Sequence, residues 1–156
     1  MPKEAIKDLI KFLTPFPDEV KQTALWLREF VWDLYPKSNE LIYDNYNALA
    51  FGFAVSDKAG DVFCSVAVYG KHVNFGFNRG SEIADQEKKL NGKGSLYRSI
   101  KVTDVKHFPK GYIIELMEEA YVNALARLEG HEQTITGQTI TKSISPKKRR
   151  PIQNAA

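Results

Sequence analysis

The sequence predicts an α+β domain with two N-terminal helices, an antiparallel sheet of about five strands and one long C-terminal helix. Two observations favour this fold class. Apolar residues recur with the 3.6-residue period of a helix up to position 35 and from 110 to 129, and with the two-residue period of strands between 40 and 103. The hydrophobic fraction of 43% is large enough to build a core.

Three helices are expected, at residues 3–13, 17–35 and 110–129. In each of them, apolar residues spaced three and four apart fall on one side of the helix. Pro15 ends the first helix and Pro36 ends the second, because proline cannot continue a helix. Gly130 is a suitable C-terminal stop for the third.

Strands are expected at 40–45, 48–55, 61–69, 72–78 and 97–103. Gly70 and Lys71 separate two alternating runs, and a two-residue loop that begins with glycine favours a tight hairpin. The 56–61 loop allows a similar hairpin between the second and third strands. The expected pairs are Tyr69 with His72, Val68 with Val73, Val66 with Phe75, Cys64 with Phe77 and Val55 with Val62.

This register separates large side chains from small ones. One face carries bulky apolar residues and is expected to pack on helices. The other face is a shallow surface of small residues, which we call the floor. Either the last helix or the C-terminal segment packs closely on the floor, or the floor receives a small ligand or a second subunit. The floor consists of Ala48, Ala50, Gly52, Ala54, Ser65, Ala67 and Gly76, with Phe63, Tyr69, His72 and Asn74 expected around it.

The basic charge of the chain is concentrated near its C-terminus. The net charge is +3, but residues 131–156 hold five basic residues and one acidic residue, so residues 1–130 are nearly neutral. Because a nucleic-acid-binding domain carries its basic surface on the folded body, binding to nucleic acid is not expected. We interpret 1–130 as a single domain and 131–156 as a basic tail with room for one short strand.

The sequence favours a cytoplasmic protein that does not enter a membrane. No apolar run approaches the roughly 20 residues that a membrane-spanning helix needs. Charged residues interrupt the apolar pattern from Lys3 onward, unlike in a signal peptide. Cys64 is the single cysteine, which excludes a disulfide within the chain.

Four segments between residues 41 and 102 resemble a known bacterial family. They are YDNYNA at 43–48, SVAVY at 65–69, HVNFGF at 72–77 and LNGKG at 90–94, accompanied by Arg79, Gly80, Arg98 and Ile100. These motifs are similar to those of the domain of unknown function 1801 (DUF1801) family, grouped with YdhG-like proteins and the frataxin (CyaY-like) superfamily. The resemblance implies helices packed on a strongly bent antiparallel sheet. It also implies iron as a ligand, because some relatives are described as frataxin-like iron chaperones, and it supplies no catalytic residues.

Polar residues near the floor are candidates for a ligand site. The glycine-rich loop at 91–95 either cradles an anion with its N–H groups and its lysine, or is a turn that needs positive φ. Two arginines either bind a carboxylate or phosphate, or hold the irregular 79–96 segment through its carbonyl groups. These candidate residues are His72, Asn74, Arg79, Asn91, Lys93 and Arg98.

Two further groups of polar residues have two interpretations each. Tyr43 and Asn45 either join a buried hydrogen-bond network or contact a ligand in an apolar cleft. Glu115, Glu118 and Glu119 either hold a hard cation such as iron or form the solvated face of the last helix. Zinc is not expected, because no histidine or cysteine has a suitable partner in the sequence.

We therefore expect a non-enzymatic protein that binds a small ligand or a metal against the floor. The alternatives are a frataxin-like iron chaperone and a protein-interaction module that dimerises through its sheet. No catalytic residue is assigned, and iron is expected from the family resemblance only. The protein is expected to be a monomer or a homodimer.

Overall fold

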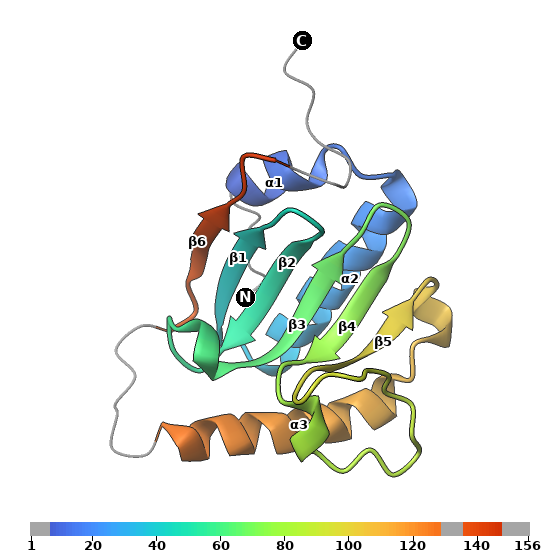
Figure 1. Ribbon diagram of the computed structural model, residues 1–156, viewed down its shortest axis with the longest axis vertical. Helices are drawn as coiled ribbons and strands as arrows, with labels where there is room; N and C mark the ends of the chain where they lie inside the picture. The colour runs from blue at the N-terminus through green and yellow to red at the C-terminus, as the bar shows by residue number, and fades with distance from the viewer. Residues whose placement is uncertain (1–6, 129–135, 148–156) are drawn as a thin grey trace.

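The computed structural model describes residues 7–128 and 136–147. It confirms the predicted α+β class, because a six-stranded sheet is accompanied by two N-terminal helices and a C-terminal helix (Figure 1). No helix in these ranges is both long enough and apolar enough to cross a membrane. The helices are α1 (Lys7–Leu13), α2 (Asp18–Leu34) and α3 (Lys110–Arg127), and the strands are β1 (Asn39–Asp44), β2 (Leu49–Ala54), β3 (Val62–Val68), β4 (Val73–Phe77), β5 (Arg98–Val102) and β6 (Thr139–Ile144).

The strands lie in the order β5-β4-β3-β2-β1-β6. The first five are antiparallel, as expected, whereas β6 pairs in parallel with β1 at the edge of the sheet. In this arrangement, α3 ends near the end of the sheet where β1 and β6 both begin (Figure 1). The segment expected to be a basic tail thus supplies the sixth strand.

The predicted register is confirmed for the hairpin of β3 and β4. The tight turn at Gly70 and Lys71 sets it, since the last backbone hydrogen bond before the turn joins the two residues that flank it. Alternate residues of both strands therefore face the same side of the sheet. The pairs observed include Val66 with Phe75 and Val68 with Val73, and the Tyr69 N–H donates to the His72 carbonyl oxygen.

A β-bulge alters the register at the end of the hairpin of β2 and β3. Most of this hairpin keeps the predicted pairing, with Phe51 opposite Val66. The expected pair of Val55 with Val62 is wrong, because Val62 lies opposite Ala54 instead. One extra residue, Phe63, stands on the β3 side of the bulge.

The bulge moves Phe63 away from the floor, so its expected place there is wrong. The Phe63 ring packs in the core, with its centroid 5.3 Å from that of Tyr35 and 5.2 Å from that of Tyr121 on α3. Val62 faces the floor side instead and lies against Gly52. The bulge therefore exchanges a large aromatic residue for a smaller aliphatic one at this end of the floor.

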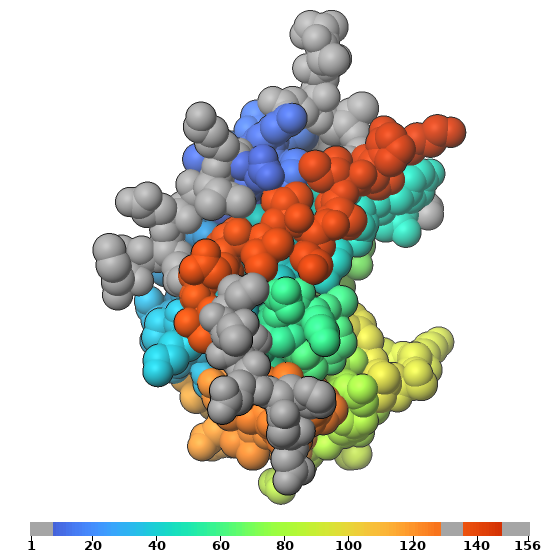
Figure 2. All heavy atoms as spheres, turned by 90° about the vertical axis from the view of Figure 1, so that its left-hand side faces the viewer, coloured from blue at the N-terminus to red at the C-terminus, as the bar shows by residue number. Residues whose placement is uncertain are grey.

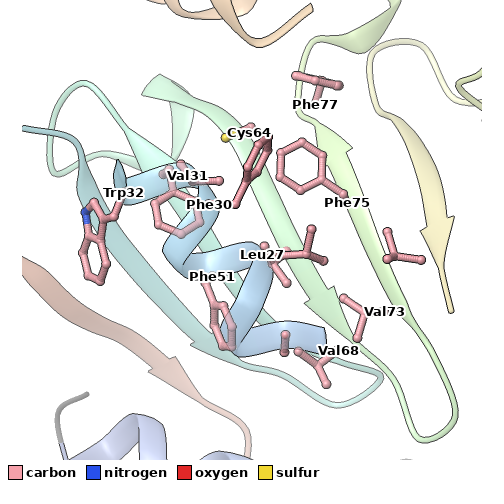
Figure 3. Close-up of a cluster of buried hydrophobic side chains, with 14 of the residues drawn as sticks. Leu27, Phe30, Val31, Trp32, Phe51, Cys64, Val68, Val73, Phe75 and Phe77 are labelled. Carbon is pink, nitrogen blue, oxygen red and sulfur yellow. The ribbon is translucent and has the colours of Figure 1, made fainter. Parts of the chain in front are cut away.

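Helices α2 and α3 pack on the bulky face of the sheet (Figure 1). Side chains of α2 such as Leu27 and Phe30 point toward Phe51 and Phe75 on the strands (Figure 3). Full burial of one such side chain stabilises the folded state by about 1.5–3 kcal/mol. Because α3 packs into this core, it does not cover the floor. Its buried residues are Ile113, Leu116, Met117, Ala120 and Ala124.

A buried ion pair joins α2 to β1, the strand next to the edge of the sheet. The Arg28 Nε donates to Glu40 Oε2 on β1 at 2.7 Å, and both side chains are almost completely buried. The Arg28 guanidinium also lies over the Trp32 ring, 4.3 Å from its centroid. On β6, the Thr139 hydroxyl donates to the other oxygen of Glu40 at 3.0 Å. One group of polar contacts therefore connects α2, β1 and β6.

Candidate functional site

The floor side of the sheet holds a cavity of about 290 Å³. It lies over β2 and β3, on the side opposite the helices. Figure 2 shows this face in profile, hollowed between the turn that joins β1 to β2 and the segment before β5. The cavity is lined by Tyr43, Asn45, Ala48, Ala50, Gly52, Ala59, Val62, Ser65, Ala67, Tyr69, Asn78 and Tyr97.

The base of the cavity is the middle of the predicted floor. Successive side chains of a strand point to opposite faces, so the small residues that alternate with the core residues of β2 and β3 all face the same way. Their short side chains leave a depression that larger side chains would fill. The floor residues that line the cavity are Ala48, Ala50, Gly52, Ser65 and Ala67.

The two remaining floor residues are covered by the protein itself. Gly76 lies beneath Tyr97, and a Cβ at position 76 would overlap the Tyr97 hydroxyl. Ala54 lies in a small apolar cluster at the other side of the floor. The chain thus covers the margins of the floor and leaves its centre open. The small cluster contains Leu41, Ala54 and Val62, with Tyr43 and Ile140 packed against it.

Three tyrosines from different parts of the chain surround the open centre. Tyr43 belongs to β1 and lies opposite Ala50 in the register, whereas Tyr97 precedes β5 and lies over Gly76 of β4. These two side chains therefore stand on opposite sides of β2 and β3. Tyr69 follows β3 and stands at one end. The result is a depression with a small-residue base and aromatic walls.

The described residues that line the cavity include no Asp, Glu, Lys, Arg or His. Burial raises the pKa of the Tyr43 and Tyr97 phenols above the ordinary value, so both stay protonated at neutral pH. The Tyr97 hydroxyl forms hydrogen bonds with the side chains of Ser65 and Ser99. The walls of the cavity are consequently polar in places but uncharged.

Two solvent-shielded side-chain atoms of the lining have no hydrogen-bond partner within the part of the chain that the structure describes. They are the Tyr43 hydroxyl and the Asn78 Oδ1, and both are shielded from solvent. An unpaired buried polar group costs about 1–3 kcal/mol. In contrast, the Asn45 Oδ1 accepts a hydrogen bond from the Ser143 hydroxyl of β6 at 3.1 Å.

Of the residues proposed from the sequence as ligand contacts, Tyr43 and Asn45 line the cavity. His72 and Asn74 lie on the same face of the sheet but are not part of the lining. The His72 ring stacks on Tyr69, with centroids 4.8 Å apart. Burial and the nearby Lys101 lower the pKa of His72, which favours its neutral form.

The other four proposed contacts lie outside this cavity. Arg79 forms an ion pair with Glu82 at 3.1 Å, and Lys93 is exposed. The Arg98 guanidinium donates two hydrogen bonds of 2.7 Å to backbone carbonyl oxygens. This agrees with the interpretation in which the arginine holds the irregular segment instead of binding an anion. Those carbonyl groups belong to Gly94 and Tyr97, and the Asn91 backbone exchanges hydrogen bonds with Ser99.

The glutamates considered for metal binding do not converge on one point. Glu119 accepts hydrogen bonds from the backbone N–H of Ala84 at 3.2 Å with both carboxylate oxygens. Glu115 and Glu118 lie beside it in an open depression on α3. Across residues 7–128 and 136–147, no group of three or more His, Cys, Asp or Glu side chains is arranged to hold a metal ion. Burial raises the pKa of the Cys64 thiol well above its ordinary value.

Four lining residues were not proposed from the sequence: Ala59, Val62, Asn78 and Tyr97. Asn78 could have been predicted from the sequence, since it continues the alternation of Asn74 and Gly76 just beyond β4. Tyr97 has no such signal, because an irregular segment places it over Gly76. Val62 was missed because the bulge changes which residues at the start of β3 face the floor.

No protein-family model, curated protein or solved structure matches this chain. The family resemblance drawn from its motifs therefore stays a prediction. The fold and the cavity define a class of architecture. It is an α+β domain whose sheet is covered by helices on one face and holds a cavity on the other.

Proposed function

We propose that this protein binds a small molecule in the floor cavity. The observation that carries the proposal is the coincidence of the cavity with the row of small residues on β2 and β3. Ligand pockets are typically concave and mainly apolar, with a few polar groups, and their volumes begin at about 300 Å³. A cavity of about 290 Å³ with three tyrosines in its walls lies at the lower limit of that range.

The composition of the two strands supports a functional origin of the cavity. On their core face, β2 and β3 carry Leu, Phe and Val side chains that are fully buried. On the floor face, the same strands carry Ala, Gly and Ser, with Val62 at one end of β3. Larger apolar residues there would bury more surface at about 25 cal/mol per Å². The small residues therefore make the fold less stable than larger ones would. Their presence is explained if the space they leave is occupied by a ligand.

The lining favours binding over catalysis. Catalysis by a nucleophile needs a base within hydrogen-bond reach of it. Among the described lining residues, Ser65 has a hydroxyl group, but its hydrogen-bond partner is the protonated phenol of Tyr97. We therefore propose a carrier or sensor domain that holds its ligand unchanged.

A fragment screen followed in amide spectra tests this proposal. The chain is labelled with ¹⁵N, and a library of small compounds is titrated while the amide signals of Ala50, Gly52 and Ala67 are observed. We expect saturable shifts of these signals with at least some compounds. The variant Ala50→Leu should abolish the shifts, because its larger side chain fills the cavity. The matched variant Ala126→Leu lies on the exposed side of α3 and should leave them unchanged.

Two results would contradict the proposal. One is a screen in which no compound shifts the floor signals. The other is binding that Ala50→Leu leaves intact, provided that the variant keeps the folded spectrum of the wild type.

A further inference from the structure

We infer that the ligand of the floor cavity is an uncharged aromatic or heteroaromatic compound with a hydrogen-bonding group at two separate positions. This inference rests on the proposed function and narrows it to a ligand class. It follows from the charge of the walls, from their shape and from the polar atoms that lack partners.

The absence of charge in the described lining excludes ions as preferred ligands. No Lys, Arg or His of the lining can neutralise an anion, and no Asp or Glu can neutralise a cation. The nearby arginines are also engaged: Arg79 pairs with Glu82, and Arg98 donates to loop carbonyl oxygens. Moving an unpaired charge into such a site is strongly unfavourable. A carboxylate or phosphate ligand is therefore disfavoured, although the sequence had suggested one.

The shape of the cavity favours a flat ring. Its base is formed by small residues of two adjacent strands, β2 and β3. Tyr43 and Tyr97 rise on opposite sides of this base, and Tyr69 rises at one end. Aromatic side chains bind ring compounds by stacked or edge-to-face contacts with centroids about 4.5–7 Å apart.

The polar groups left for a ligand are few, which argues against a sugar. Ser65 and Tyr97 are bonded to each other, and Asn45 is bonded to Ser143. The shielded polar atoms of the lining without a described partner are the Tyr43 hydroxyl beside β1 and the Asn78 Oδ1 beyond β4. Both atoms are shielded from water and belong to side chains that line the cavity. A polyhydroxylated ligand would leave most of its hydroxyl groups unpaired.

Three probes of similar size test the ligand class. Two probes carry a hydroxyl group on the far side of the ring from the second polar group: 4-hydroxybenzamide and 4-hydroxybenzoate, called benzamide and benzoate below. They have nearly the same shape but differ in charge, and glucose is uncharged but polyhydroxylated. Each is titrated into the ¹⁵N-labelled full chain, and the floor amide signals are observed. We expect benzamide to bind at least about tenfold more tightly than benzoate, because the cavity offers no counter-charge. Glucose should give no saturable shift.

Two conservative variants test the polar contacts. Tyr43→Phe and Asn78→Ala each remove one of the unpartnered groups and should weaken benzamide binding about three- to tenfold, the effect of one uncharged hydrogen bond. Asn74→Ala is the matched control, because Asn74 shares the sheet face but not the lining, and it should leave the affinity unchanged. Equal loss in all three variants would contradict the assigned contacts.

The outcomes separate the ligand class from the proposed function. Benzoate or glucose binding as tightly as benzamide overturns the ligand class and leaves the cavity as a binding site. The ligand class is overturned in the same way if benzamide gives no shift while other compounds of the fragment screen do. If neither the probes nor the screen shift the floor signals, both the ligand class and the proposed function fail.

Discussion

At the scale of single residues, the contact of Tyr97 with Gly76 decides how far the cavity extends. Glycine at position 76 allows the Tyr97 side chain to lie directly on β4, where its hydroxyl reaches Ser65 and Ser99. The phenol thereby forms a wall of the cavity instead of projecting into solvent. The irregular segment before β5 is thus connected to the floor by one aromatic residue.

The variant Gly76→Ala tests this contact. The new Cβ would overlap the Tyr97 hydroxyl, so the tyrosine must move and give up its hydrogen bonds to the two serines. We expect the free energy of unfolding to fall by about 1–2 kcal/mol in urea titrations. In a Tyr97→Ala background the same substitution should cost about 1 kcal/mol less, because neighbouring residues are coupled. Additive effects of the two substitutions would refute the contact.

At the scale of elements, the position of β6 depends on contacts that the sequence did not indicate. Its composition is typical of a strand, but nothing in the sequence selects β1 as its partner or a parallel direction. In the structure, Glu40 accepts hydrogen bonds from Arg28 of α2 and from Thr139 of β6. A carboxylate on β1 thereby links this strand to a helix and to the neighbouring edge strand.

Replacement of Arg28 by methionine tests how much this linkage contributes. It removes the cation that neutralises the buried Glu40 carboxylate, and breaking a buried pair in this way costs about 3–5 kcal/mol. We expect a loss of this size in the free energy of unfolding measured with urea. Arg79→Met is the matched control, because it removes a partly exposed ion pair that is worth about 1 kcal/mol or less. Similar losses in the two variants would show that the buried pair contributes no more to the free energy of unfolding than the partly exposed pair does.

At the scale of the whole molecule, the two-faced sheet explains both what the sequence could predict and what it could not. The alternation of residues such as Ala50 and Phe51 is a local pattern, and with the Gly70–Lys71 turn it was sufficient for the strands, most of the register and the floor. The walls depend on contacts between distant segments. Tyr97 reaches the floor from an irregular segment, and the bulge at Phe63 leaves no local signal.

The anion-binding interpretation of Arg98 also depended on contacts between residues that the sequence does not show. Arg98 is close in sequence to the glycine-rich loop, but loop carbonyl groups occupy its guanidinium. Residue type and spacing suggested a ligand contact, whereas the three-dimensional path of the loop made it a structural contact. The centre of the molecule's open face is consequently uncharged, which the sequence alone did not indicate.

A crystal structure of the protein with the most tightly bound compound of the fragment screen tests the central claim most directly. The account predicts electron density for the compound on the floor, in contact with Ala50 and between Tyr43 and Tyr97, with no charged side chain against it. Density for the compound at another site, or a floor filled by the protein's own side chains, would contradict the account.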